Sequence, residues 1–270
     1  MIVPARSLVI TDLVVRYGDV EAVHGASFSA FAGEVLGLLG PNGAGKTSVL
    51  RVLTTLLRPH AGRAWILGHD VTREAALVRR LIGYVPQSLS ADGSLTGREN
   101  ASLFAKLYAV PRAARRGRAD EVLSLMGLGE AADQPVRTYS GGMIRRLEIA
   151  CALVNSPRML FLDEPTVGLD PLARREVWRH LGSLRDDAGA TLLVTTHSME
   201  EAEEHCQRVV VMSAGSVRGE GSPAQLRKAL GQPGGTLEDV FVALTESDRQ
   251  QTKGDLRDVN RSRRAARRLG

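Results

Sequence analysis

The sequence predicts an α/β fold with a mainly parallel sheet. Short apolar runs typical of buried strands alternate with stretches of helical periodicity, the pattern that places helices on both faces of such a sheet. One of these runs, 35–39, leads directly into a glycine-rich loop. With 270 residues, 43% of them apolar, the chain can bury the core of one large domain, or of a domain with an insertion.

Strand-like segments occur in two groups along the chain. The first two, 7–17 and 21–31, are rich in Val, Ile and Phe, and Tyr17-Gly18-Asp19 forms the turn between them. They predict a small antiparallel sheet beside the main one. Further strands are expected at 35–39, 64–67, 82–85, 159–162 and 191–196, with a closing hairpin at 209–212 and 216–219.

A long helical stretch interrupts the strands. From about Leu95 to Val154 apolar residues recur with helical spacing, which predicts an all-helical insertion. A later helix is marked by its ends, because Asp170 can cap it, Pro171 suits its first turn and Gly189 ends it. The helices expected within the insertion are 96–108, 111–126 and 142–154, and those expected elsewhere are Lys46 to about Leu57, 223–230 and 237–244.

The glycine-rich loop predicts a phosphate site. Without Cβ atoms in the way, its backbone N–H groups converge on phosphate oxygens, and the following helix directs the positive end of its dipole at the same anion. Lys46 supplies a charge for the outer phosphates, and the Thr47 hydroxyl supplies a ligand for Mg²⁺. The competing interpretation is a tight turn between strand and helix. The residues expected to bind the nucleotide here are Gly40, Pro41, Asn42, Gly43, Ala44, Gly45, Lys46, Thr47 and Ser48.

Two carboxylates follow a second buried strand. Four apolar residues, 159–162, deliver Asp163 and Glu164 at the end of that strand, just before Pro165, and ligand chemistry in such sheets collects at this edge. Asp163 is expected to hold Mg²⁺ directly or through water, and Glu164 to orient or deprotonate a water for attack on the γ-phosphate. Alone the pair is equally consistent with an acidic turn, but together with Lys46 it predicts triphosphate hydrolysis.

The segment Thr138-Tyr139-Ser140-Gly141-Gly142-Met143 opens a helix upstream of this pair. It resembles the signature motif of ATP-binding cassette (ABC) ATPases, and the resemblance covers roughly residues 7 to 245. Ser140 can cap the helix while the N–H groups of Gly141 and Gly142 stay free to bind an anion. The resemblance implies a P-loop NTPase core whose signature motif serves the ATP of a second copy in a head-to-tail dimer.

Four further roles are implied by the resemblance alone. Tyr17 matches the aromatic that stacks on adenine, and His197 matches the switch histidine that contacts the γ-phosphate. Gln87 matches the glutamine that touches Mg²⁺ and water and reports the nucleotide state to a membrane subunit. Asp170 lies in a loop like the one that joins the two sites of the dimer. The alternatives left open are a strand aromatic for Tyr17, a surface or core histidine for His197, an exposed loop residue for Gln87, and for Asp170 a helix cap, which is compatible with the implied role.

Tyr139 and Met143 stand where Leu and Gln are more usual in this motif. This variant and the segment 237–245 resemble the daunorubicin-resistance-type branch of drug exporters. The resemblance implies an ATPase subunit, at the cytoplasmic face of the cell membrane, that drives a separate permease, and the segment 88–101 lies where the family receives a permease helix. Two other functions compete with this one: a soluble ABC ATPase acting on nucleic acid or ribosomes, and a binding module that uses ATP only as a clamp.

The domain organisation predicted is an ABC ATPase domain at 1–245, with the helical insertion at about 88–155, and a basic tail at 246–270. The tail holds much of the net charge of +5 and almost no apolar residues, so it is expected to be disordered. Contact with an anionic membrane surface and a solvated tail without a partner both remain open, and no specific nucleic acid is expected.

Cys151 and Cys206 are expected to be buried free thiols. No apolar run long enough to span a bilayer and no signal-peptide pattern are found, which favours a cytosolic protein.

Overall fold

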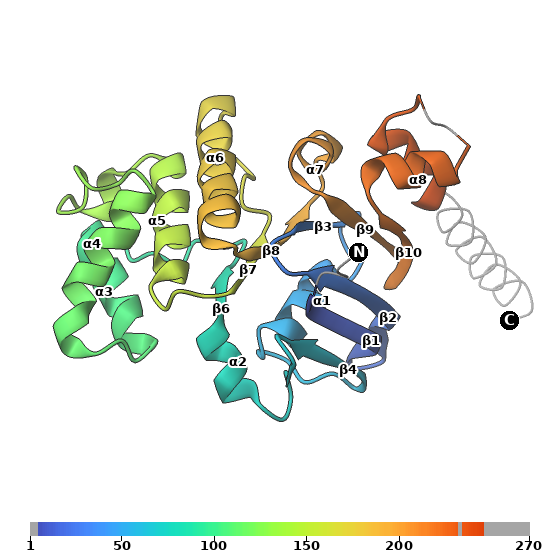
Figure 1. The fold of residues 1–270 in the computed structure, drawn as a ribbon, viewed down its shortest axis with the longest axis horizontal. Coiled ribbons are helices and arrows are strands. Elements are labelled where there is room, and N and C mark those ends of the chain that lie inside the picture. The colour runs from blue at the N-terminus through green and yellow to red at the C-terminus, as the bar shows by residue number, and fades with distance from the viewer. Residues whose placement is uncertain (1–4, 232–233, 246–270) are drawn as a thin grey trace, which may run out of the picture.

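The computed structural model describes residues 5–231 and 234–245. A main sheet of six strands has the order β10-β9-β3-β8-β7-β6, and all neighbours in it are parallel except β9 and β10 (Figure 1). Its strands are β3 (Val35–Leu39), β6 (Ile82–Val85), β7 (Met159–Asp163), β8 (Thr191–Thr196), β9 (Arg208–Ser213) and β10 (Ser216–Gly221). The predicted α/β fold with a mainly parallel sheet is confirmed.

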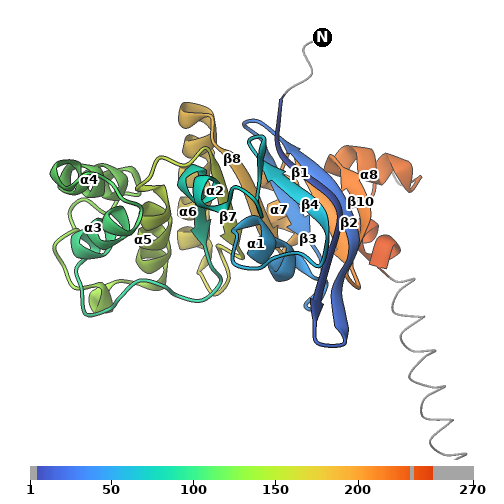
Figure 2. The same cartoon turned by 90° about the horizontal axis from the view of Figure 1, so that it is seen from below.

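A second, antiparallel sheet of four strands has the order β2-β1-β4-β5 and lies beside the main sheet in both ribbon views (Figure 2). Its strands are β1 (Arg6–Tyr17), β2 (Val20–Phe31), β4 (Ala61–Ile66) and β5 (His69–Asp70). The predicted small antiparallel sheet is therefore present. The strand expected at 64–67 begins earlier, at Ala61, and joins this sheet as β4.

Eight α-helices have complete bounds in the described part of the chain: α1 (Lys46–Leu53), α2 (Ala75–Leu81), α3 (Gly97–Leu107), α4 (Arg115–Leu125), α5 (Gly141–Leu153), α6 (Pro171–Ala188), α7 (Met199–His205) and α8 (Pro223–Ala229). Residues 237–245 are also helical. Helices α3, α4 and α5 pack against one another and form a separate layer at the left of Figure 1. We call this group the helical layer.

The core lies on both faces of the main sheet. Successive side chains of a strand point to opposite faces, so Leu36 and Leu38 of β3 join one apolar cluster while Val35 and Leu39 join the other. The first cluster lies between the main sheet and the antiparallel sheet with α1, and the second lies between the main sheet and helices α5 and α6. Because both faces are covered, the central strands β3, β7 and β8 are buried along their whole length.

Four helical elements differ from the sequence-based expectation. Helix α1 ends at Leu53 rather than near Leu57, because Thr55 takes a left-handed backbone with φ 62° that no continuing helix allows. The helix expected at 111–126 is divided into a 3₁₀ turn, Arg112–Ala114, and α4. The seven-residue helices α2 and α7 were not predicted, since they are too short for a clear periodic signal.

Two sequence-based expectations concern the basic C-terminal tail and membrane-spanning helices. The basic tail at 246–270 lies outside the described residues. Among the helices of residues 5–231 and 234–245, none is both long and apolar enough to cross a membrane.

The close packing of β6 against α5 gives a stability test. A Cβ added at Gly83 would lie 2.4 Å from the Ala152 carbonyl oxygen and 2.7 Å from Leu160 Cδ1. We expect Gly83→Ala to lower the free energy of unfolding by about 1–3 kcal/mol, because an added methyl group has to push backbone apart. The matched control is Gly117→Ala in α4, where a Cβ meets nothing within 4 Å and the change is expected to stabilise by about 0.5–1 kcal/mol. Urea denaturation measures both, and equal effects would contradict the packing argument.

Candidate functional site

The glycine-rich loop joins β3 to α1 at the carboxyl end of the main sheet. Gly45 precedes the first residue of α1 with φ 98°, and a Cβ there would lie 2.5 Å from the Ala22 carbonyl oxygen, so the position requires glycine. The loop lines a pocket of about 240 Å³. The residues around that pocket are Ala22, Asn42, Gly43, Ala44, Gly45, Lys46, Thr47, Ser48, Gln87 and Glu164. The amino end of α1, free of any side-chain cap, therefore faces a cavity that accepts an anion.

Lys46 is held inside this loop. Its Nζ donates to the Gly40 carbonyl oxygen at 2.6 Å and to the Pro41 carbonyl oxygen at 3.1 Å. Burial lowers the pKa of Lys46 from its ordinary value, while the carboxylates of Glu164 and Asp163 act in the opposite direction. The two carbonyl groups thus keep the amine at the pocket in the absence of an anion.

Asp163 is oriented by the neighbouring strand. In the parallel register of β7 and β8, Asp163 lies opposite Thr195, whose hydroxyl donates to Asp163 Oδ1 at 2.6 Å. The other carboxylate oxygen, Oδ2, lies 3.4 Å from Thr47 Oγ1. Because Thr195 occupies one oxygen, Asp163 presents the second one to the phosphate loop.

Side chains that follow two other strands, β6 and β8, contact the Glu164 carboxylate. Gln87, after β6, donates from Nε2 to Glu164 Oε2 at 3.2 Å, and His197, after β8, has Nδ1 3.5 Å from Glu164 Oε1. The Glu164 side chain is 10% exposed and that of His197 is 60% exposed. Glu164 also has a left-handed backbone with φ 48°, an uncommon and strained conformation for a non-glycine residue. The structure thus brings together Lys46, Thr47, Gln87, Asp163, Glu164 and His197.

Tyr17 lies at the end of β1 beside the same helix. Its ring is exposed, and its hydroxyl is 3.4 Å from both Ser48 Oγ and Arg51 Nη1. An aromatic surface therefore stands next to the first turn of α1, outside the phosphate pocket.

The signature residues form a second group away from the pocket. Ser140 caps α5 by accepting from the Met143 N–H at 3.3 Å, and Asp170 caps α6 by accepting from the N–H groups of Leu172 and Ala173. A Cβ added at Gly142 would lie 2.7 Å from Ala173 Cβ, so the two helix starts are side by side. Within the described residues, neither Ser140, Gly141 and Gly142 nor Asp170 lines the phosphate pocket.

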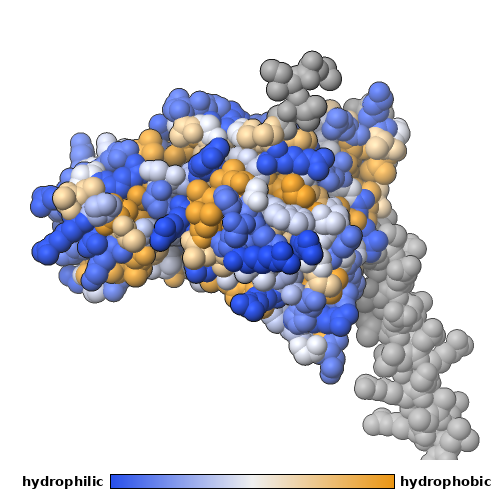
Figure 3. Space-filling view, turned by 60° about the horizontal axis from the view of Figure 1, so that its bottom comes forward, coloured by the Kyte–Doolittle hydropathy of each residue, from blue (hydrophilic) through white to orange (hydrophobic). Residues whose placement is uncertain are grey.

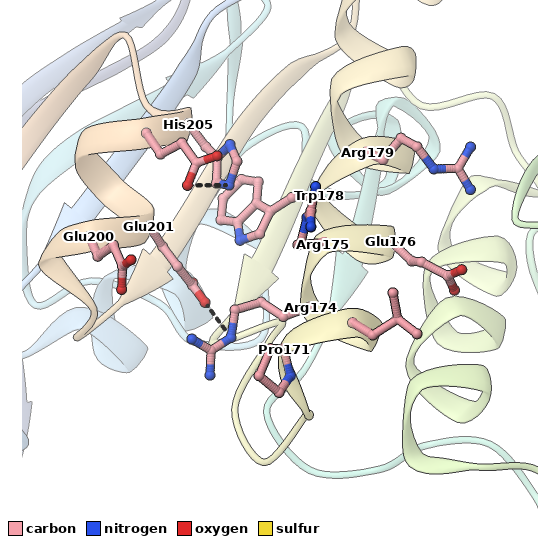
Figure 4. A pocket seen from close by; sticks show the side chains of 11 residues that line it. Pro171, Arg174, Arg175, Glu176, Trp178, Arg179, Glu200, Glu201 and His205 are labelled. Atoms are coloured by element: carbon pink, nitrogen blue, oxygen red, sulfur yellow. Dashed lines mark ion pairs between the residues drawn. The ribbon is translucent and has the colours of Figure 1, made fainter.

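A larger groove of about 920 Å³ between α6 and α7 contains none of the predicted site residues. Trp178 stacks on His205 with ring centroids 4.3 Å apart, and Arg174 Nε lies 3.2 Å from Glu201 Oε1 (Figure 4). These contacts join the two walls of the groove. The groove therefore marks the place where α7 packs on α6.

Sequence reasoning missed Thr195 and the buried pair Arg145 and Glu148, which lie 5% and 3% exposed in α5. Thr195 is the second-last residue of the buried strand that leads to His197, and that position was the available signal. Arg145 and Glu148 look like an ordinary exposed pair three residues apart on a helix.

The contacts of Thr195 predict a stability effect at this site. Its hydroxyl accepts from the Glu164 N–H at 2.9 Å in addition to its bond to Asp163. Thr195→Val keeps the shape but removes this bonding, and we expect a loss of about 1–3 kcal/mol of unfolding free energy. Thr195→Ser, which keeps the hydroxyl, is the matched control and is expected to lose less. Equal losses of the two variants in thermal or urea unfolding would contradict the expectation that the hydroxyl matters more than the methyl group.

Comparisons with known proteins identify the family of this chain. The family profile described as ABC transporter matches residues 23–167. The daunorubicin resistance ATP-binding protein DrrA3 of Streptomyces coeruleorubidus is 48% identical over 227 residues, covering 84% of this chain and 71% of that protein. The Nod factor export ATP-binding protein I of Ralstonia nicotianae is 44% identical over 211 residues, covering 78% of this chain and 65% of that protein.

Solved structures share the same fold. One is a dimeric ATP-binding cassette in a post-hydrolysis state, bound to ADP and Pi, with a TM-score of 0.71 and 27% identity over 80% of this chain and 98% of its own. The chain therefore belongs to the ABC transporter family, as one of its ATP-binding and ATP-hydrolysing domains.

Proposed function

We propose that this chain is the ATPase subunit of an exporter that moves a drug-like or hydrophobic compound through a separate membrane permease. The observation that carries the hydrolytic part is the meeting of Gln87, Glu164 and His197 beside the phosphate loop. Relatives named for daunorubicin resistance and for Nod factor export support the exporter part. In this arrangement the compound passes through the permease, so its identity is not encoded in the ATPase.

ATP is held by complementary charge and shape. The N–H groups of the loop from Gly40 to Ser48 and the amino end of α1 bind the phosphates. Lys46 exchanges its loop carbonyls for the outer phosphate oxygens, and Tyr17 stacks on the adenine.

The residues beside the loop fit Mg²⁺. Thr47 Oγ1 and Asp163 Oδ2 are oxygen donors 3.4 Å apart, and oxygen is the ligand that Mg²⁺ prefers. We assign these two groups, with Gln87, to the metal, which supplies neutralisation of phosphate charge when bound. Thr195 keeps Asp163 in the orientation that this requires.

Hydrolysis is assigned to Glu164 as the general base. One of its carboxylate oxygens accepts the proton of a water that attacks the γ-phosphorus, and the bond to the leaving ADP breaks as the new P–O bond forms. Gln87 and His197 contact the two oxygens of Glu164 and so orient the carboxylate. His197, being exposed, is also free to meet the γ-phosphate.

A second copy completes the site. Ser140 and Gly141 are exposed at the start of the thirteen-residue helix α5, where free N–H groups attract a phosphate. We propose that this end binds the γ-phosphate held by a partner copy in a head-to-tail dimer, with Asp170 at the junction. The dimeric state of the related cassette bound to ADP and Pi supports this proposal.

The permease is proposed to dock beside the helical layer. An apolar pocket of about 290 Å³ lies between the ends of α1 and α3 and the strand β6, and Leu56 and Leu107 at its rim are 66% and 71% exposed. Figure 3 brings this side of the molecule forward, and apolar side chains gather between the helical layer and the antiparallel sheet. Because β6 leads into Gln87, a helix seated here, against the nearby segment 88–101, acts directly on the catalytic side chains.

The cellular location and the domain limits follow from these assignments. Docking on a permease places the chain at the cytoplasmic face of the membrane. We retain residues 1–245 as the ATPase domain, with the helical insertion at about 88–155, and 246–270 as a basic tail. The charge of that tail suits an anionic membrane surface.

Replacing the general base tests the hydrolytic assignment. We expect Glu164→Gln to lower kcat for ATP hydrolysis about 100- to 10,000-fold, while ATP still binds, because the phosphate loop is intact. The variant should also form a dimer with ATP on size-exclusion chromatography, since hydrolysis no longer releases the partner. Glu130→Gln, at an exposed position, is the control and should behave as the unmodified protein. Unchanged turnover in Glu164→Gln would refute the assignment.

A surface leucine tests the permease site. Leu107→Glu places a charge at the rim of the apolar pocket, and burying that charge in an interface is unfavourable. We expect purification of this variant from its native membranes in mild detergent to recover at least about tenfold less of the bound integral membrane protein. Leu125→Glu, 45% exposed at the end of α4, is the control and should retain it. A chain recovered with ribosomes or nucleic acid, and with no integral membrane protein, would favour the soluble alternative.

A further inference from the structure

A buried ion pair in α5 lies between the two catalytic segments. Arg145 Nη1 and Glu148 Oε2 are 3.0 Å apart, and both side chains are almost fully buried. Burying two charges is costly unless every polar atom finds a partner. The partners that these two side chains find are backbone groups on either side of Glu164 and of Gln87.

The guanidinium of Arg145 donates hydrogen bonds to the residues on both sides of Glu164. Its Nη2 donates to the Asp163 carbonyl oxygen at 2.9 Å, and its Nε donates to the Pro165 carbonyl oxygen at 2.8 Å. These are the carbonyl groups of the residues immediately before and after Glu164. Since Glu164 has a strained left-handed backbone, these two bonds stabilise a conformation that the chain does not favour on its own.

The same ion pair forms hydrogen bonds with residues on both sides of Gln87. Arg145 Nη1 donates to the Pro86 carbonyl oxygen at 2.7 Å, on one side of Gln87. On the other side, Glu148 Oε1 accepts from the Ser90 N–H at 2.5 Å and from its hydroxyl at 3.2 Å. The segment that carries Gln87 is therefore held at both ends by α5.

We propose that Arg145 and Glu148 are positioning residues that set the distance between Gln87 and Glu164 for hydrolysis. This inference rests on the proposed role of Glu164 as general base. Neither side chain lines the phosphate pocket, in the part of the chain that the structure describes, so they act through the two residues that do. The alternative is a purely structural pair that fastens α5 to the sheet.

The chemistry of arginine suits this task. A planar guanidinium carries N–H donors in fixed directions, whereas the lysine ammonium is a single compact centre. Four acceptors, the carbonyl oxygens of Pro86, Asp163 and Pro165 and the Glu148 carboxylate, receive bonds from one Arg145 side chain. A lysine cannot reach the same groups simultaneously, so Arg145→Lys keeps the charge and loses the geometry.

The test compares steady-state ATP hydrolysis of the full-length protein with its variants. Arg145→Lys, and the double variant Arg145→Met with Glu148→Met that leaves no unpaired buried charge, should lower kcat about 10- to 100-fold, because small misplacements of catalytic groups have effects of this size. The KM for ATP should stay within about twofold, since the phosphate loop is untouched. Gln87→Ala should lower kcat by a smaller factor in the Arg145→Lys protein than in the parent protein, because both changes remove the same alignment.

Arg118→Met is the matched control. Arg118 of α4 also donates to two backbone carbonyl oxygens, those of Leu153 and Val154, and pairs with Glu121. Among the described residues, these partners lie outside the segments that carry Gln87 and Glu164. Arg118→Met should lower the melting temperature as Arg145→Lys does and leave kcat unchanged. An equal loss of kcat in Arg118→Met would overturn the positioning role. So would a kcat within twofold of the parent for both Arg145 variants, if Glu164→Gln is inactive. Full turnover by Glu164→Gln would instead overturn the general-base assignment and, with it, this inference.

Discussion

Parallel pairing of β3, β8, β7 and β6 is the interaction on which the rest of the structure depends. In a parallel sheet all strands end at the same edge, so the residues that follow these strands become neighbours despite large separations in sequence. The phosphate loop follows β3, Gln87 follows β6, Glu164 follows β7 and His197 follows β8. The register of Asp163 opposite Thr195 then fixes the carboxylate relative to Thr47.

The edge alone does not hold the proposed catalytic side chains in place. Glu164 has a strained backbone, and the groups that stabilise it come from two directions: Thr195 within the sheet, and Arg145 from α5. The pair of Arg145 and Glu148 links α5, which begins within the signature segment, to the residues that flank Gln87 and Glu164, the two side chains proposed to act in hydrolysis. The helical layer is in this way continuous with the active site through hydrogen bonds between named groups.

Much of the fold was predictable because its local signals agree with each other. The strand at 82–85, the strand at 191–196 and the helix between Asp170 and Gly189 have the expected bounds, since each is apolar with the right period or marked by a cap. The early end of α1 at Leu53 and the short helices α2 and α7 were not predictable. Their limits are set by backbone turns and by packing on neighbouring elements, which leave no periodic signal in segments of seven residues.

The sequence by itself determined the ligand and the chemical groups, because a glycine-rich loop with Lys46 and Thr47, and an acidic pair after a buried strand, are local patterns with few other uses. It also determined, through Ser140 to Gly142, the membership of the family. Only the tertiary structure decided which groups meet. Arg145 and Glu148 look like surface charges in sequence, and Thr195 looks like a strand residue. Their contacts with Glu164 and with the residues that flank Glu164 and Gln87 depend on pairing and packing between segments far apart in the chain, which no local pattern encodes.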